Sequence, residues 1–233
     1  KTETKVTAIN TGNKTVETAD KTGKPESITY DSLIIGTGES PFMPPIKGKE
    51  KQGIHSLRTL EDGARIDQVI KKGAKTAIVM GAGLIGLETA IAFHERGLKT
   101  TVVELLPQIL PIMLDADMAK IAQEMLQEKG LNILTGKGVE EFLGSDKVTG
   151  IVAGGERIDA DLFVSAFGVR SNTQLAANAG VALGETKAIK TNARMETSIK
   201  DVYAIGDCAE ATHIVTQKPA LPQLGTVAVR QGK

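Results

Sequence analysis

The sequence predicts an α/β protein in which one unit, built on a parallel sheet, interrupts a second unit. Three observations support this. An apolar strand, Thr76–Met80, leads into a glycine-rich turn and a helix, as in a βαβ unit. Two more apolar strands, Leu33–Ile35 and residues 202–205, end in glycine and lie on opposite sides of that block. A proline-rich segment, residues 40–48, separates the first of them from the block and is the expected interdomain linker.

The composition excludes several classes of protein. The 233 residues carry 28 Lys and Arg against 28 Asp and Glu, so no basic field attracts nucleic acid or anionic lipid. Cys208 is the only cysteine, which excludes an internal disulfide and a cysteine-rich zinc site. No apolar run approaches the ~20 residues that span a bilayer, and residues 1–5 do not resemble a signal peptide. We therefore expect a soluble, cytoplasmic chain without nucleic-acid or membrane partners.

Residues 1–35 alternate like strands. Residues 5–9 and 15–18 flank a turn at residues 11–13, which predicts a β-hairpin. A second turn leads to a strand at residues 28–30 and then to Leu33–Ile35.

Helical and strand patterns alternate from Thr59 onward. Thr59 is a suitable N-cap for a helix ending near Lys72. A helix at residues 84–96 should end at Gly97, and a third should begin near Asp115. The third carries an apolar stripe of Met118, Ile121, Ala122, Met125 and Leu126. Further strands are expected at residues 100–104, 132–134, 139–142, 148–152 and 162–167.

The turn after Thr76–Met80 has the form GxGxxG and consists of Gly81, Ala82, Gly83, Leu84, Ile85 and Gly86. In a Rossmann-like unit the first glycine permits the turn, the second admits a pyrophosphate and the third lets the helix pack closely. The helix N-terminus then faces the phosphates. Glu104 closes the next strand, where a carboxylate binds ribose hydroxyls. A glycine-rich turn without a ligand is the alternative, but this context favours dinucleotide binding.

Two acidic residues refine this prediction. Glu104 repels a 2′-phosphate, and residues 105–108 contain no Lys or Arg, which favours NAD(H) over NADP(H). Glu88 lies in the first helical turn, where it either complements the helix dipole or serves the ligand. The sequence leaves both roles of Glu88 open.

Two other glycine-containing turns follow apolar strands, Thr37 and Gly38 in one and Gly206 and Asp207 in the other. Each alone would be interpreted as an ordinary turn. Their position at strand carboxyl ends, where open α/β sheets bind ligands, favours a second binding unit.

Residues 33–41, 81–88 and 203–210 resemble, in order and spacing, the pyridine nucleotide-disulfide oxidoreductases. The resemblance covers essentially the whole chain and is greatest to the branch of NADH oxidase, NADH peroxidase and coenzyme A-disulfide reductase. It implies an NAD(H)-binding domain at residues 51–197, inserted in a partial FAD-binding domain at residues 1–50 and 198–233. Hydride would pass from NADH to FAD, and a small-molecule acceptor (dioxygen, peroxide or a disulfide) would be reduced.

The resemblance also implies roles for particular residues. Glu88 matches a glutamate near the nicotinamide, and Gly168 a glycine of the NAD-side loop. Asp207 would hold the ribityl or pyrophosphate part of FAD. The other residues expected near FAD are Thr37, Gly38, Gly206, Leu224, Gly225 and Thr226.

The chain departs from the family pattern in several places. We find no N-terminal FAD phosphate motif, redox cysteine or C-terminal dimerisation domain, so we interpret the chain as a central fragment with no catalytic residue of its own. The fragment alone should be inactive and hold FAD weakly or not at all, and the intact enzyme should be a homodimer. Ser171 replaces a usual proline, and Met113 replaces a frequent tyrosine. Cys208 is expected to be a packing residue, and no metal site is predicted.

Two alternative functions remain at this point. One is a non-catalytic NAD(H)-binding module. The other is a nucleotide-sugar or NADP-type dehydrogenase, although the sequence shows no Tyr-Lys or Ser-His pattern to support it.

Overall fold

The computed structural model describes residues 1–233, which form two compact units. One consists of Lys1–Ser40 and Arg170–Lys233, and the other is the continuous segment Pro41–Val169. The sequence placed the limits of the inserted segment at residues 51 and 197, whereas the continuous compact unit runs from Pro41 to Val169. The limits differ at the C-terminal side because residues 170–197 pack within the discontinuous unit.

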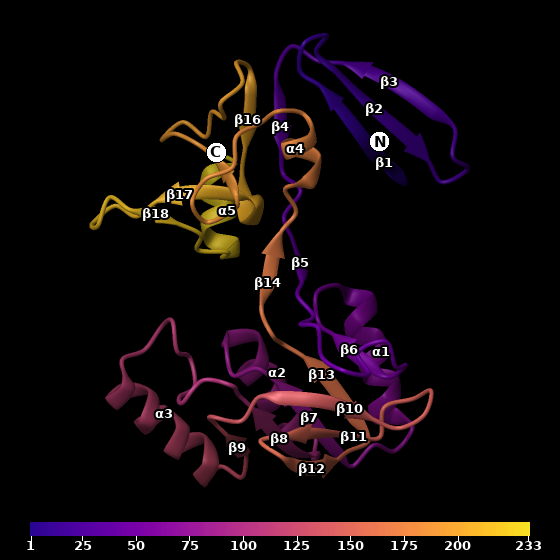
Figure 1. The fold of residues 1–233 in the computed structure, drawn as a ribbon, viewed down its shortest axis with the longest axis vertical. Helices are drawn as coiled ribbons and strands as arrows, with labels where there is room; N and C mark the ends of the chain where they lie inside the picture. Colours follow the sequence, from indigo (N-terminus) through magenta and orange to yellow (C-terminus); the bar gives the residue numbers. More distant parts are fainter. The chain divides into compact units, whose positions relative to one another are not determined.

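The inserted unit is built on a five-stranded parallel sheet with the order β6-β13-β7-β8-β9 (Figure 1). The apolar strand β7 is its centre and is buried from Ala77 onward. The strand bounds are β6 Ile54–Ser56, β7 Thr76–Met80, β8 Lys99–Val103, β9 Asn132–Leu134 and β13 Leu162–Ser165. The predicted strands of this block are confirmed, whereas the short edge strand β6 was not predicted.

Alternate side chains of β7 pack on opposite faces of the sheet, as the period of two requires. Ala77 and Val79 join the core beneath the helices, and Ile78 and Met80 join a second core. The second core lies against an antiparallel sheet of β10 (Val139–Leu143), β11 (Gly150–Ala153) and β12 (Glu156–Asp159). The unit therefore has three layers: helices, parallel sheet and antiparallel sheet.

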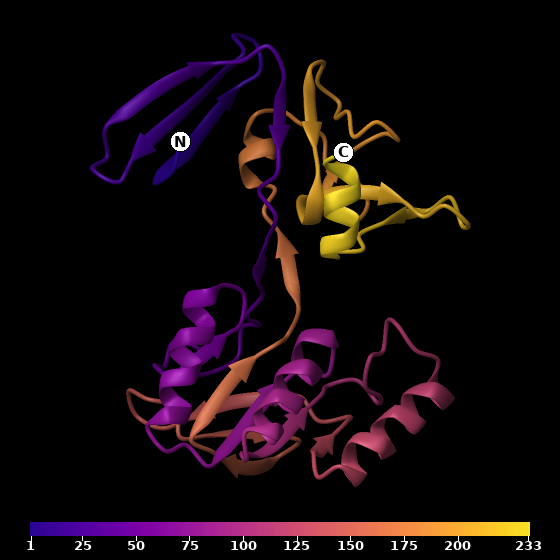
Figure 2. The same ribbon diagram turned by 180° about the vertical axis from the view of Figure 1, so that it is seen from behind.

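Three helices cover one face of the parallel sheet. Figure 2 shows this unit from the side opposite to that of Figure 1. Helix α1 (Leu60–Lys71) contacts β6 and β13, α2 (Leu84–Glu95) contacts β7 and β8, and α3 (Ala116–Glu128) contacts β9. The expected N-cap of α1 is confirmed, since Thr59 and Asp62 form a capping box.

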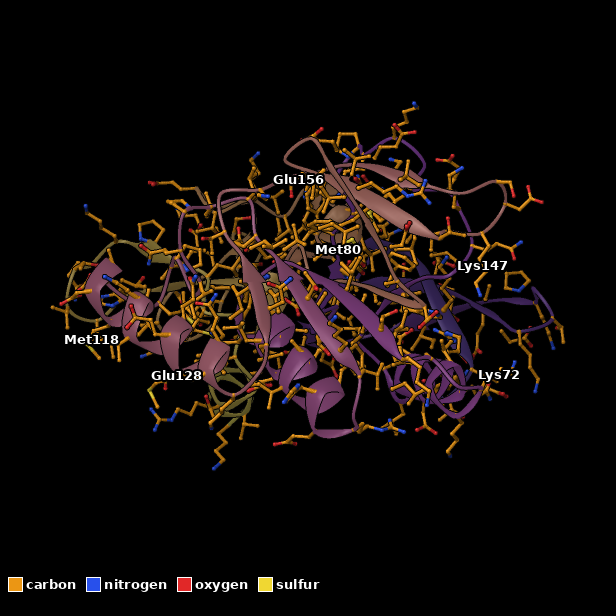
Figure 3. All side chains as sticks on the ribbon, turned by 90° about the horizontal axis from the view of Figure 1, so that it is seen from below. Lys72, Met80, Met118, Glu128, Lys147 and Glu156 are labelled. Carbon is orange, nitrogen blue, oxygen red and sulfur yellow. The ribbon has the colours of Figure 1, made fainter.

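The apolar stripe of α3 is only partly buried. Its members Ala122 and Leu126 are half-buried against the core, but Met118, Ile121 and Met125 are 52%, 51% and 56% exposed. The buried residue of α3 is Ala119, which was not part of the predicted stripe. Figure 3 labels Met118 and Glu128 near the two ends of this helix. The stripe is wider than the contact with the edge strand β9 can cover, so three of its five residues remain exposed.

The discontinuous unit contains the predicted hairpin, β1 (Thr4–Asn10) and β2 (Thr15–Asp20), extended by β3 (Pro25–Thr29). Its centre is the parallel pair β4 (Leu33–Ile35) and β16 (Val202–Ala204). The remaining elements were not predicted: β5 Glu39–Pro41, β14 Val169–Ser171, α4 Gln174–Asn178, β15 Ile189–Lys190, the 3₁₀ turn η1 Gly206–Cys208, β17 Ala209–Thr212, β18 Pro219–Ala220 and α5 Gly225–Gln231.

Residues 170–197 belong to this unit because they supply part of its core. Ala176 of α4 and Ile189 of β15 are buried in one cluster with Ile35 and Val202. The Thr11 hydroxyl also donates a hydrogen bond to the Ala179 carbonyl. No helix in either unit is both long and apolar enough to span a lipid bilayer.

Candidate functional site

The glycine-rich turn joins β7 to α2 and is held by contacts that exclude side chains at two of its glycines. Gly81 has φ +114°, and a Cβ there would collide with the carbonyl oxygen of Ala166 on the chain leaving β13. A Cβ on Gly86 would collide with the carbonyl of Gly81. The fold itself therefore requires glycine at both positions.

Gly83 differs from these two glycines. Its φ is −76°, and no atom lies within 4 Å of the place where a Cβ would stand. The fold would therefore tolerate a side chain here. Gly83 is also the N-cap of α2, and no side chain caps this helix, whereas Thr59 caps α1. An open glycine at an uncapped helix N-terminus fits a phosphate group that approaches the backbone closely.

Glu104 follows β8 and turns back to the glycine-rich turn. Its Oε2 accepts a hydrogen bond from the Ala82 N–H at 2.7 Å, and its Oε1 accepts one from the Leu106 N–H at 2.8 Å. An ionised carboxylate offers about four acceptor positions, so about two remain for hydroxyl donors. The carboxylate is thus oriented by the main chain, with its negative charge beside the turn.

A lysine near Glu104 was not recognised from the sequence. Lys137 donates its main-chain N–H to the Glu104 carbonyl at 2.9 Å. Its ammonium group, however, forms an ion pair with Glu156 at 2.8 Å. That bond holds the pKa of Glu156 below its ordinary value. The nearby cation is therefore already partnered, and Glu104 remains the charge that faces the turn.

Leu84, Ile85 and Glu88 lie at the surface near the start of α2. The first turn contains no acidic residue, so Glu88 lies beyond it, and its expected position in that turn is wrong. Leu84 and Glu88 line a groove of about 320 Å³ between α2 and α3. Met125 and Lys129 line its other side. The Glu88 carboxylate makes no ion pair. Its place beyond the first turn argues against the helix-dipole role, because that effect falls off within the first turn, and the ligand role stays a prediction.

Gly168 lies beyond the end of β13, which neighbours β7 in the sheet. Its φ is +97°, and its carbonyl accepts a hydrogen bond from Phe42 N–H at 2.9 Å. Carboxyl ends of adjacent parallel strands share one sheet edge. Gly168, Gly81 and Glu104 are therefore gathered at the same edge.

The second candidate site lies in the discontinuous unit, at the ends of β4 and β16. Leu33, Ile34 and Ile35 pair with Val202, Tyr203 and Ala204, so the two following turns emerge side by side. Thr37 is exposed and Gly38 has φ +62°, while Gly206 has φ +74° and Asp207 is half-buried. The Asp207 carboxylate takes part in no ion pair and remains available to a donor.

The Gly206–Cys208 turn is fixed from several directions. Gly206 N–H donates to Gln231 Oε1 of α5 at 2.7 Å, and the Ser171 hydroxyl donates to the Asp207 carbonyl at 2.5 Å. Cys208 is fully buried, and its Sγ lies 3.3 Å from the Ile205 carbonyl oxygen. These contacts agree with a packing role for the cysteine. Gln231 was not recognised from the sequence, and Ser171 was noted there only as a replacement of a usual proline. No sequence pattern indicates which distant side chain reaches a turn.

Leu224, Gly225 and Thr226 are exposed at the start of α5. Gly225, like Gly83, has no atom within 4 Å of a Cβ position and no positive φ that requires glycine. The fold leaves space there, as it does at Gly83.

The remaining titratable residues do not form a metal site. No group of three or more His, Cys, Asp or Glu side chains is arranged to hold an ion. Burial lowers the pKa of His55, with a smaller contribution from the charges of Arg65 and Lys147. His94 packs beside Gly130 at the end of α3.

The chain was compared with known families and proteins. The family described as pyridine nucleotide-disulphide oxidoreductase matches residues 1–232. An NADH oxidase of Methanocaldococcus jannaschii is 42% identical over the whole chain, which covers 52% of that relative. An NAD(P)H sulfur oxidoreductase (CoA-dependent) of Pyrococcus furiosus is 33% identical over 88% of the chain and 48% of the relative. The chain thus spans about half the length of these relatives.

Two solved structures have the same fold. An NAD-dependent persulfide reductase from A. fulgidus matches with a TM-score of 0.96 at 39% identity, over 99% of this chain and 42% of that one. A water-forming NADH oxidase from Lactobacillus brevis, solved with NADH, matches with a TM-score of 0.91 at 30% identity, over 98% and 51%. These matches confirm the predicted fold class.

Proposed function

Because the chain belongs to the pyridine nucleotide-disulphide oxidoreductase family, whose members use FAD and NAD(H), we propose that it works in a flavin-dependent NADH oxidoreductase. In this proposal the inserted unit binds NADH, and the discontinuous unit contributes to the binding of FAD. When bound, FAD would supply the group that takes up a hydride from NADH, and the electrons would go on to the acceptor.

One observation carries the NADH assignment. Gly83 is a glycine that the fold does not need, at a helix N-terminus that no side chain caps. A pyrophosphate at this position would receive N–H groups and the positive end of the α2 dipole. Glu104, held by two main-chain N–H groups, would accept the ribose hydroxyls and repel a 2′-phosphate.

On the flavin side, the proposed contacts are Thr37, Gly38, Gly206 and Asp207, with residues 224–226 near the ring. The half-buried Asp207, whose carboxylate makes no ion pair, and the open Gly225 support the assignment. The Asp207 carboxylate would accept hydroxyl donors of the ribityl chain. Its negative charge does not suit a phosphate, so a ribityl contact is preferred over a pyrophosphate contact.

The acceptor is proposed as a small molecule. One relative is named an NADH oxidase, and others are named for CoA-dependent sulfur or persulfide reduction. We propose dioxygen, peroxide or a disulfide-type compound as the class of acceptor.

Calorimetric titration of the chain with NADH and NADPH tests the proposal. We expect NADH to bind at least tenfold more tightly, because of the Glu104 charge. Equal affinities would contradict the Glu104 assignment. If the chain binds NADH but leaves the absorption spectrum of FAD unchanged even at high FAD concentration, a non-catalytic NAD(H)-binding module is favoured instead.

A further inference from the structure

Two turns that we assign to flavin binding are joined by the main chain only at their bases. The Ile205 N–H donates to the Ile35 carbonyl at 3.0 Å, and the ladder between β4 and β16 ends there. Beyond this bond, Thr37–Gly38 and Gly206–Asp207 extend without a main-chain hydrogen bond between them.

Ser171 and Asn172, at the end of β14, connect both turns. The Ser171 hydroxyl donates to the Asp207 carbonyl at 2.5 Å. Asn172 donates its main-chain N–H to the Gly38 carbonyl at 2.9 Å and its Nδ2 to the Thr37 carbonyl at 2.9 Å. The Thr37 hydroxyl donates in return to the Asn172 carbonyl at 2.6 Å. We call these two consecutive residues the brace.

We infer that the brace is a positioning element for the flavin site, and that Ser171 sets the orientation of Asp207. This inference rests on the proposed function. The Asp207 carboxylate makes no ion pair, so its direction depends on the main chain that carries it. Gln231 fixes the N–H before Asp207, and Ser171 fixes the carbonyl after it. Without the hydroxyl, the peptide after Asp207 could rotate, and the carboxylate would lose its fixed direction.

A matched control exists in the same unit. The Thr191 hydroxyl donates a hydrogen bond at 2.8 Å to the carbonyl of Glu210, which lies three residues after Asp207 in the sequence. Ser171 and Thr191 are both half-buried, and each bonds one distant carbonyl. Loss of either hydroxyl should affect stability similarly, but only Ser171 acts on the proposed flavin turn.

The experiment is a fluorescence titration of FAD into the full chain and its variants, extended to high FAD concentration. We expect Ser171→Ala to weaken FAD binding about five- to tenfold, whereas Thr191→Val stays within twofold. Ser171→Thr, which keeps a hydroxyl, should restore the affinity. Thermal midpoints should fall equally in Ser171→Ala and Thr191→Val, and NADH affinity should be unchanged in both.

FAD titration of the variant Asp207→Asn distinguishes two outcomes: that the positioning role of Ser171 is wrong, and that the flavin assignment itself is wrong. If Asp207→Asn weakens FAD binding but Ser171→Ala matches Thr191→Val, the positioning role is wrong and the flavin site stands. If Asp207→Asn binds FAD like the unchanged chain, the flavin assignment is wrong and the positioning role falls with it. If the unchanged chain binds no FAD even at high FAD concentration, Asp207 contacts no flavin in this chain, and the positioning role is wrong.

Discussion

At the scale of single residues, Glu104 combines two tasks that the sequence could not separate. Its carboxylate holds the glycine-rich turn through Ala82 N–H and, in our proposal, also binds the ribose. If the proposal is right, the same charged group contributes to both local structure and nucleotide specificity.

Replacing Glu104 tests both tasks. We expect Glu104→Ala to weaken NADH binding by about 1–3 kcal/mol, the range for a lost hydrogen bond to a charged group. The dissociation constant for NADPH divided by that for NADH should fall about tenfold, because the charge that repels the 2′-phosphate is gone. Calorimetry measures both. Glu128→Ala, which changes an exposed side chain on α3, is the control, and an unchanged ratio in Glu104→Ala would argue against the role in specificity.

Gly83 offers a second test at this scale. Since its backbone is extended and its Cβ position is open, Gly83→Ala should leave the thermal midpoint nearly unchanged. Its methyl group would occupy the proposed phosphate position, so NADH affinity should fall at least tenfold. Gly12→Ala, where a Cβ would make only an ordinary contact, controls for glycine replacement itself. Normal NADH binding by Gly83→Ala would refute the phosphate assignment.

At the scale of elements, Asp161 joins the beginnings of two neighbouring parallel strands. It precedes β13 and accepts hydrogen bonds from Lys75 N–H at 2.9 Å, from Thr76 N–H at 3.0 Å and from the Thr76 hydroxyl at 2.8 Å. The main-chain bond from Lys75, followed by those from Thr76, lowers the pKa of Asp161 below its ordinary value.

This bonding predicts a pH dependence of stability. Because the pKa of Asp161 is lower in the folded state, the ionised carboxylate stabilises the fold at pH values above its ordinary pKa near 3.8. This contribution is lost as the pH falls below 3.8 and through the lowered pKa of the folded state. Asp161→Ala should lose about 1 kcal/mol at pH 7, since the site is exposed and partly screened. In urea denaturation, the difference in free energy of unfolding between Asp161→Ala and the unchanged chain should shrink below about pH 4. A difference that persists at low pH would exclude this mechanism, and Asp159→Ala provides the surface control.

At the scale of the whole molecule, the two units differ in how the chain builds them. The inserted unit is one continuous segment with cores on both faces of its sheet. The other unit is assembled from both ends of the chain.

The continuous unit should therefore fold by itself. We expect residues 41–169, produced alone, to unfold cooperatively and to bind NADH within about threefold of the full chain, because every proposed NADH contact lies inside the segment. Circular dichroism and calorimetry measure these properties. A segment that is unfolded, or that binds NADH much more weakly, would show that the rest of the chain contributes to the site.

The sequence by itself determined the parts of this protein that depend on neighbouring residues. The strand β7, the glycine-rich turn and the Thr59 cap could be predicted because their periodicity, backbone geometry and capping are set within a few positions. The class of fold followed from the order of these elements, and the comparisons confirm it. The cofactor contacts themselves remain predictions.

Only the tertiary structure decided what depends on distant segments meeting. The outward half of the α3 stripe follows from how little of the helix β9 can cover. The connection of Ser171 to Asp207 joins residues 36 positions apart. Short elements such as β6 and β14 form by pairing with distant partners. These strands are too short to show a periodicity in the sequence, and they are stabilised by the strands beside them. They could therefore not be predicted from the sequence.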